Sequence, residues 1–144
     1  TLFLLEAFLL VGFTDKMNFL KKIKKYSEDS PEEEICGFIV KNKTKIEIKK
    51  CKNISIDKKN NFEIPTEEYI QALKSYKIVS IYHSHPNTGE EFSEQDLAIS
   101  EELIIPILVY SNKTKKFNFF KPEEIRKNKI INDIQKSVSL GVKV

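Results

Sequence analysis

The sequence is poor in several residue types that mark large protein classes. Its 144 residues include no tryptophan, one methionine, two cysteines and four glycines. Two cysteines cannot build the disulfide framework of a small secreted domain. The four glycines do not cluster into a phosphate-binding loop, and no repeats or low-complexity tracts occur. The charge excess is also small, since 24 basic and 21 acidic residues leave a net charge of +3, so we expect no nucleic-acid partner.

The longest apolar stretch, Thr1 to Phe13, is too short to be a membrane span, which needs ~20 apolar residues, and Glu6 interrupts it. It also lacks the basic start and the small-residue cleavage site of a signal peptide. Amphipathic sequence begins at the only methionine, Met17. We therefore expect an apolar N-terminal extension (1–16), a single domain (17–122) and a C-terminal helix or linker (123–144). The extension is either upstream translated sequence or a short apolar helix docked on the domain.

The periodicity of apolar residues predicts an α/β domain, with a mixed β-sheet flanked by helices. We expect helices over 17–26, 66–76, 94–102 and 123–137, and strands over 35–41, 45–51, 62–64, 78–82, 104–110 and 117–120. The first two strands should form a hairpin. Thr66 should cap the second helix, Pro106 should lie at the start or edge of its strand, and the polar connector 54–61 should be mobile.

Both histidines of the chain follow one apolar run, in the order His83-Ser84-His85-Pro86. Residues two apart in a strand face the same side, so the two imidazoles should lie next to each other at the strand end. Ser93-x-x-Asp96 then opens a helix with a capping pattern, which places Asp96 in the first turn and within reach of both rings.

Two imidazoles and a carboxylate form a ligand set typical of catalytic zinc, which keeps its fourth position for water. Bound zinc lowers the pKa of that water to ~7, and hydrolysis then needs a general base. Glu34, just before an apolar strand, is the candidate for this base. Each part has a simpler interpretation, since a Ser-x-x-Asp pattern is commonly only a helix cap, but the ordered combination is specific.

Together, Glu34-x-Cys36-Gly37, the His83 to Pro86 segment and Ser93-x-x-Asp96 resemble the JAMM motif of the JAB1/MPN/Mov34 metallopeptidases. The resemblance implies an MPN fold, related to that of cytidine deaminases, and one Zn²⁺ per chain. Carried over residue by residue, it implies zinc ligands at His83, His85 and Asp96. It further implies that Glu34 is the general acid/base and that Ser93 stabilises the oxyanion.

The segment from Cys51 to Tyr69 is similar to the JAB domain of phage tail assembly proteins of the lambda K type. We therefore predict a zinc-dependent metallopeptidase or isopeptidase, a hydrolase that is a component of phage tail assembly. The resemblance implies a peptide or a ubiquitin-like or sulfur-carrier-like protein as substrate, or tail proteins and a separate NlpC/P60 domain as partners. The short segment 111–116 has no insertion that would clamp ubiquitin. We expect a cytoplasmic location, or the virion tail if the protein is viral.

The alternative is a non-catalytic assembly module in which zinc only stabilises a subunit of a tail or another complex. Two residues of the motif should have structural roles. Ser84 should face the opposite side of the strand from the histidines. Cys36 should be a packing residue, and a catalytic pair of Cys36 with a histidine is less favoured because the metal site already accounts for both histidines.

Overall fold

The computed structural model describes residues 18–122 and 129–141, which contain four helices and five strands. In chain order the elements are α2 (Asn18–Asp29), β1 (Cys36–Asn42), β2 (Lys45–Cys51), α3 (Thr66–Ser75), β3 (Lys77–His85), α4 (Glu94–Leu103), β4 (Ile107–Ser111), β5 (Phe117–Phe120) and α5 (Lys129–Leu140). The predicted extension 1–16 lies outside the described residues. No helix of the described segments is long and apolar enough to span a membrane.

The five strands form one mixed sheet in the order β2-β1-β3-β4-β5. β1 pairs antiparallel with both β2 and β3, β4 pairs antiparallel with β5, and β3 and β4 run parallel. The predicted hairpin is therefore confirmed, with Cys36 opposite Cys51 and Asn42 opposite Lys45. β4 begins directly after Pro106, so this proline lies before the first paired residue of an internal strand and removes no ladder hydrogen bond.

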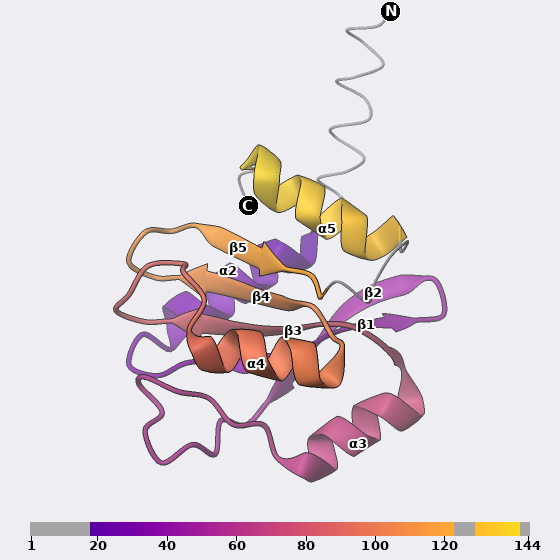
Figure 1. Ribbon diagram of the computed structural model, residues 1–144, viewed down its shortest axis with the longest axis horizontal. Coiled ribbons are helices and arrows are strands. Elements are labelled where there is room, and N and C mark those ends of the chain that lie inside the picture. The colour runs from indigo at the N-terminus through magenta and orange to yellow at the C-terminus, as the bar shows by residue number, and fades with distance from the viewer. Residues whose placement is uncertain (1–17, 123–128, 142–144) are drawn as a thin grey trace, which may run out of the picture.

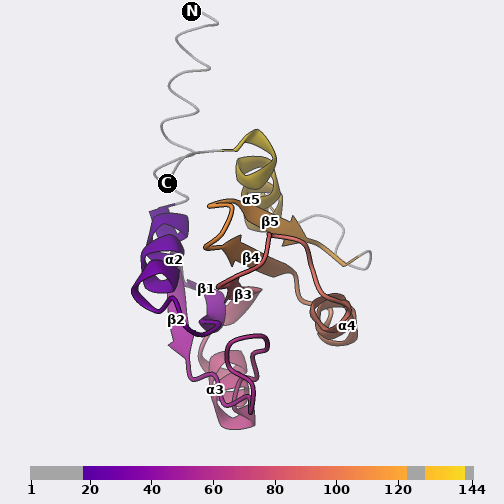
Figure 2. The ribbon, with the colours of Figure 1, turned by 90° about the vertical axis from the view of Figure 1, so that its left-hand side faces the viewer.

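Helices cover both faces of the sheet, as the predicted fold class requires. α2 and α5 lie on one face and α3 and α4 on the other (Figure 1, Figure 2). The first face buries apolar residues of α2 and α5 against Ile39, Tyr82 and Leu108. The second face buries Ala72 of α3 against residues that include Phe38. This arrangement confirms a single α/β domain with one hydrophobic layer on each side of the sheet.

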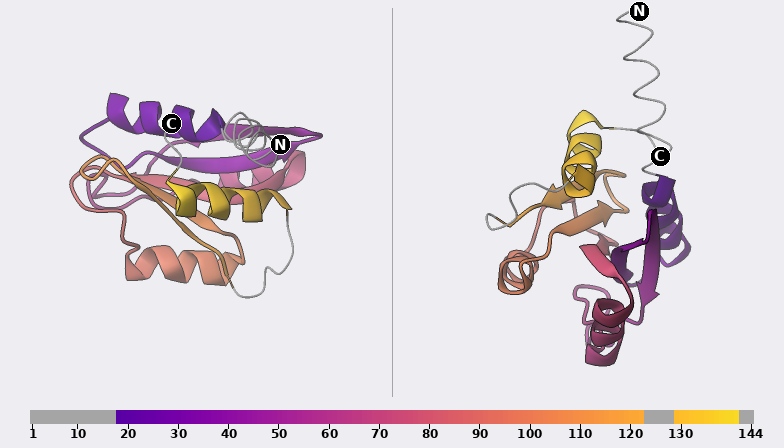
Figure 3. Two further views of the ribbon diagram at one scale, coloured as in Figure 1. Left: turned by 90° about the horizontal axis from the view of Figure 1, so that it is seen from above. Right: turned by 90° about the vertical axis from the view of Figure 1, so that its right-hand side faces the viewer.

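The unit β3–α4–β4 determines where the polar residues of interest meet. Because β3 and β4 are parallel, the chain leaves the carboxyl end of β3, passes through a loop and α4, and returns to the opposite end for β4 (Figure 3). In sheets of this kind, ligands bind beside the carboxyl ends of parallel strands. His83 and His85 are at this end of β3, and α4 begins next to it.

Two local predictions around α3 were wrong. Residues 62–64 form no strand, since the Glu63 amide donates to the Asn53 side chain at 3.1 Å instead of a neighbouring strand. The same Asn53 side chain also donates to the Lys58 carbonyl and accepts the Ser55 amide in the connector 54–61, whose mobility stays a prediction. α3 has Pro65 as its N-cap, without a side-chain cap, in place of the predicted Thr66.

Candidate metal centre

The two histidines lie side by side at the end of β3, as their spacing predicted. The imidazole centroids of His83 and His85 are 5.0 Å apart. The exposed fraction is 0% for His83 and 7% for His85, and it is equally low for two nearby carboxylates, Glu34 at 5% and Asp96 at 3%. Four ionisable residues thus share one buried region, and each needs a partner there because an isolated buried charge is very unfavourable.

The Nδ1 atom of each imidazole is already engaged by the protein. His83 Nδ1 lies 3.1 Å from Glu34 Oε1, and His85 Nδ1 lies 2.7 Å from the carbonyl oxygen of Gly89. A carbonyl can only accept, so His85 Nδ1 carries the proton and its Nε2 keeps a free lone pair. Metal-binding histidines commonly donate their second N–H to a carboxylate or a backbone carbonyl in this way. The contacts therefore favour Nε2 as the metal-facing atom of both rings.

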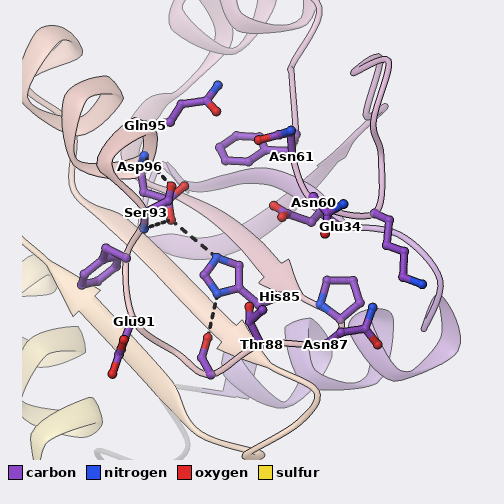
Figure 4. Close-up of a pocket in the computed structure, with 15 residues that line it drawn as sticks. Glu34, Asn60, Asn61, His85, Asn87, Thr88, Glu91, Ser93, Gln95 and Asp96 are labelled. Atoms are coloured by element: carbon purple, nitrogen blue, oxygen red, sulfur yellow. Dashed lines mark hydrogen bonds and ion pairs between the residues drawn. The ribbon is translucent and has the colours of Figure 1, made fainter.

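Asp96 approaches both histidines at this second nitrogen. Its Oδ1 lies 3.2 Å from His83 Nε2, and its Oδ2 lies 3.5 Å from His85 Nε2. The predicted capping box holds Asp96 there, because its amide donates to Ser93 Oγ and its Oδ2 accepts from the Ser93 amide, both at 3.0 Å. Figure 4 shows His85 held between Asp96 and the loop that precedes α4.

His83 Nε2 is buried and has no hydrogen-bond partner of good geometry in the described part of the chain. Its contact with Asp96 has the length of an ion pair without the direction of a hydrogen bond. Asp96 thus lies beside one nitrogen of each imidazole. Two imidazoles and one carboxylate match the donor set of catalytic zinc sites. The residues present therefore fit a zinc ion.

Asp96 is absent from the one group of possible ligands whose atoms all lie close to one another among the described residues. Single ligand atoms of Glu34, His83 and His85 all lie within 4.8 Å of one another. Glu34 contacts His83 through Nδ1, whereas Asp96 contacts it through Nε2. The two carboxylates thus contact different nitrogens of His83. Of the two, only Asp96 lies next to the Nε2 atoms of both imidazoles.

The carboxylates also control the protonation of the metal-free cluster. Burial alone lowers the pKa of His83, but the neighbouring Asp96 and Glu34 outweigh it and raise the pKa to about 9. Burial opposes the ionisation of Asp96, yet contacts with His83 and His85 hold its pKa well below the usual range. These shifts favour a protonated His83 beside an ionised Asp96.

An open cleft of about 340 Å³ lies beside the cluster, and its walls include Glu34, His85, Ser93 and Asp96 (Figure 4). Ser93 Oγ accepts the Asp96 amide, so its own proton remains available for a group in the cleft. A neighbouring apolar hollow of about 310 Å³, which extends towards α3 and α4, shares Phe62 as a lining residue. The cluster therefore borders a cleft that shares part of its wall with an apolar hollow.

Some supporting residues have the roles expected from the sequence. The Ser84 hydroxyl accepts the Ile35 amide at 2.9 Å and is fully buried, which gives it a structural role. The Cys36 thiol is free and buried, and burial raises its pKa to about 12, so it is not a nucleophile at neutral pH.

The sequence pattern did not indicate two further contacts. The Phe62 ring stacks on His83, with centroids 4.5 Å apart. Gly89 orients His85 through its carbonyl oxygen. The Gly89 contact depends on backbone position, for which no local signal exists, and a single aromatic residue such as Phe62 is only a weak signal of packing.

Residues 18–125, more than half of the chain, match the family described as prokaryotic homologs of the JAB domain. The chain belongs to this family, and the predicted family is thereby confirmed.

The chain also resembles individual proteins. It is 32% identical to tail tip assembly protein K of Escherichia phage N15 over 74 residues, which make up 51% of this chain and 30% of that protein. The predicted likeness to phage tail assembly proteins is thus confirmed, although the match spans less than a third of that relative.

Two solved structures are also similar. Protein DSY2949 from Desulfitobacterium hafniense has a TM-score of 0.56 at 16% identity, with coverage of 69% of this chain and 75% of that chain. This likeness supports the fold alone. AF2198, a JAB1/MPN domain protein from Archaeoglobus fulgidus, has a TM-score of 0.49 at 16% identity, with coverage of 71% and 82%.

Proposed function

We propose that this JAB-domain protein is a zinc-dependent hydrolase of peptide or isopeptide bonds. His83, His85 and Asp96 would be the ligands of one zinc ion per chain. Glu34 would act as the general base and Ser93 as the oxyanion donor. The observation that carries the proposal is that both Nδ1 atoms are engaged by the protein while both Nε2 atoms face Asp96 beside an open cleft.

Bound zinc would polarise the scissile carbonyl and lower the pKa of a water molecule, so that hydroxide becomes available at neutral pH. The protein side chains supply the remaining steps. Glu34 lines the cleft and takes the proton of the attacking water, then passes it to the leaving amine. The Ser93 hydroxyl donates to the oxygen that gains negative charge, a role that can contribute ~3 kcal/mol.

The size of the cleft indicates which substrates can fit. The polar cleft at the cluster and the apolar hollow towards α3 and α4 share Phe62 and Gln95. An extended polypeptide can therefore place its scissile bond near His85 and a flanking segment against the apolar residues. This size suits a peptide or the flexible end of a small ubiquitin-like or sulfur-carrier-like protein. The sequence likeness to a tail tip assembly protein favours a substrate among phage tail proteins, and a separate NlpC/P60 domain is the proposed partner there.

The second candidate function is a non-catalytic assembly module whose zinc site stabilises a tail subunit. The likeness to tail tip assembly protein K favours it as well, because assembly alone requires no turnover. The two functions differ in what they require of the cluster. A stabilising zinc site has four protein ligands as a rule, whereas only three donors converge here on the Nε2 side within the described residues.

The test combines metal analysis with hydrolysis. Zinc-loaded protein is incubated with ubiquitin-like fusions, phage tail proteins and peptidoglycan peptides, and cleavage is followed by mass spectrometry. We expect about one zinc per chain and cleavage of at least one substrate class, both lost in Asp96→Asn protein. Zinc binding without cleavage of any substrate, together with normal tail assembly by Glu34→Gln protein, would favour the assembly module.

A further inference from the structure

The segment between β2 and α3, residues 52–65, forms one wall of the cleft without a secondary structure of its own. Most of its side chains from 54 to 61 are exposed, so apolar burial contributes little to its conformation. Polar contacts must therefore hold it, and they converge on one side chain, that of Asn53.

The Asn53 side chain uses its full hydrogen-bonding capacity on the backbone. Its Nδ2 donates to the carbonyl oxygens of Glu34 and Asn61, both at 2.9 Å. Its Oδ1 accepts the amides of Ser55 at 3.0 Å and Glu63 at 3.1 Å. An amide side chain has two N–H donors and two acceptor lone pairs, and here all four are used. Only one orientation of the amide satisfies these partners, because carbonyl oxygens cannot donate.

Through these bonds, Asn53 connects the segment to the backbone of Glu34. The Glu34 carbonyl accepts from Asn53, and the Glu34 amide donates to the carbonyl of Lys58 at 2.7 Å. Both backbone polar groups of Glu34 are thus held by this segment. The Asn53 Oδ1 atom accepts the amide of Glu63, the residue that follows Phe62. Asn53 thereby fixes the backbone next to Phe62, whose ring stacks on His83.

We propose that Asn53 is a positioning residue of the site: it sets the place of Glu34 and holds Phe62 against His83. The inference rests on the proposed function of Glu34 as the general base. Asn53 lines no part of the metal cluster's own cleft, so it acts through Glu34 and Phe62 and does not contact the reacting atoms. Displacement of a catalytic group by ~1 Å can lower a rate by ~10²-fold, so loss of this support should reduce turnover.

Two substitutions separate the two halves of the Asn53 side chain. Asn53→Ala removes these four bonds and a longer one to the Lys58 carbonyl at 3.4 Å, and it should lower kcat at least ~10-fold, with a loss of the ring-current shift that Phe62 imposes on His83 in NMR spectra. Asn53→Asp is isosteric and keeps the acceptor for Ser55 and Glu63, but it cannot donate to Glu34. It should retain the His83 shift while kcat falls. Zinc affinity should fall by no more than the ~10–100-fold typical for loss of a histidine's second partner, because Glu34 and Phe62 contact only His83, while His85 and Asp96 are held by Gly89 and Ser93.

Ser55→Ala is the matched control. It removes a hydrogen bond within the same segment, from the Asp57 amide to Ser55 Oγ at 3.2 Å, which does not involve Glu34. This variant should keep wild-type kcat. If Asn53 only stabilises the segment, its two variants should unfold at a lower temperature than the wild type. The kcat of Asn53→Asp protein should then stay close to that of the Ser55→Ala control.

The outcomes distinguish this inference from the proposed function. Wild-type turnover in Asn53→Asp protein would overturn the positioning role while the proposed function stands. If zinc-loaded wild-type protein cleaves nothing, the proposed function fails, and the positioning role is then judged by hydrogen exchange. Faster exchange of the Glu34 amide in Asn53→Ala but not in Ser55→Ala would support it, and unchanged exchange would overturn it.

Discussion

Exchanging each carboxylate for its amide distinguishes the proposed base from the proposed ligand. Glu34 and Asp96 both contact His83, but Glu34 lies at Nδ1 and Asp96 at Nε2. The grouping of Glu34 with both histidines within 4.8 Å offers the opposite assignment. Glu34→Gln and Asp96→Asn change neither the size nor the shape of the side chain much, so the two variants report on chemistry and not on packing.

The contact between Glu34 and His83 determines how strongly Glu34→Gln should change zinc affinity and turnover. In Glu34→Gln protein the amide oxygen can still accept the His83 Nδ1 proton, so the ring keeps its orientation and its tautomer. Loss of a partner of this kind typically lowers metal affinity by ~10–100-fold, and with the acceptor retained we expect the effect to be at most ~10-fold. Gln cannot take a proton from water at neutral pH, so turnover should fall by ~10²–10⁴-fold.

The assay measures zinc content after dialysis, zinc affinity by competition with a chelator, and kcat on the substrate found in the screen. Asp96→Asn protein should lose both zinc and turnover, whereas Glu34→Gln protein should keep zinc and lose only turnover. The inactive variant should also retain the substrate and so serve as a trap for it. If Glu34→Gln releases zinc while Asp96→Asn retains it, Glu34 is the ligand and the assignment is wrong.

Three further outcomes are expected. His85→Ala protein should contain no bound zinc, and full occupancy by metal analysis would exclude His85 as a ligand. Gly37→Ala should destabilise the fold by ~1–3 kcal/mol or more in urea denaturation, because the added Cβ would clash with the Lys49 carbonyl oxygen and the Tyr82 ring, whereas Gly89→Ala has no close neighbour and should change stability little. Metal-free protein should become less stable as pH rises: the pKa of His83 is raised from 6.5 to about 9, so its stabilisation is complete below 6.5 and is lost through pH 9. Denaturation midpoints at pH 6 and pH 9 in chelator that do not differ would contradict the charged state of His83.

The sequence predicted the elements that carry strong local patterns. The alternation around Ile46 and Ile48 placed β2 at the observed residues, and the Phe117–Phe120 run placed β5 equally well. The capping pattern at Ser93 predicted both the start of α4 and the position of Asp96. These features depend on the chain within a few residues, so they can be read without knowledge of the tertiary structure.

The features that could not be predicted depend on long-range contacts. The sequence around residues 54–63 gives no sign that the Asn53 side chain bonds to the backbone of Glu34, Asn61, Ser55 and Glu63. Residues 62–64 were therefore wrongly predicted to pair as a strand. The stacking of Phe62 on His83 joins residues from different parts of the chain in the same way. The spacing of the histidines predicted that the rings meet, but only the structure shows which nitrogen of each ring is engaged.

The composition of the buried cluster favours a metal site over a purely structural role. Four ionisable residues, Glu34, His83, His85 and Asp96, are buried together at the end of β3. Buried ion pairs are often no more stabilising than apolar residues of similar volume, so fold stability does not explain them. A cation between His83 Nε2, His85 Nε2 and Asp96 would satisfy the nitrogen of His83 that has no good hydrogen-bond partner. The same cluster borders a cleft that Ser93 also lines, which is the arrangement that the proposed hydrolysis requires and that a metal with a purely stabilising role does not.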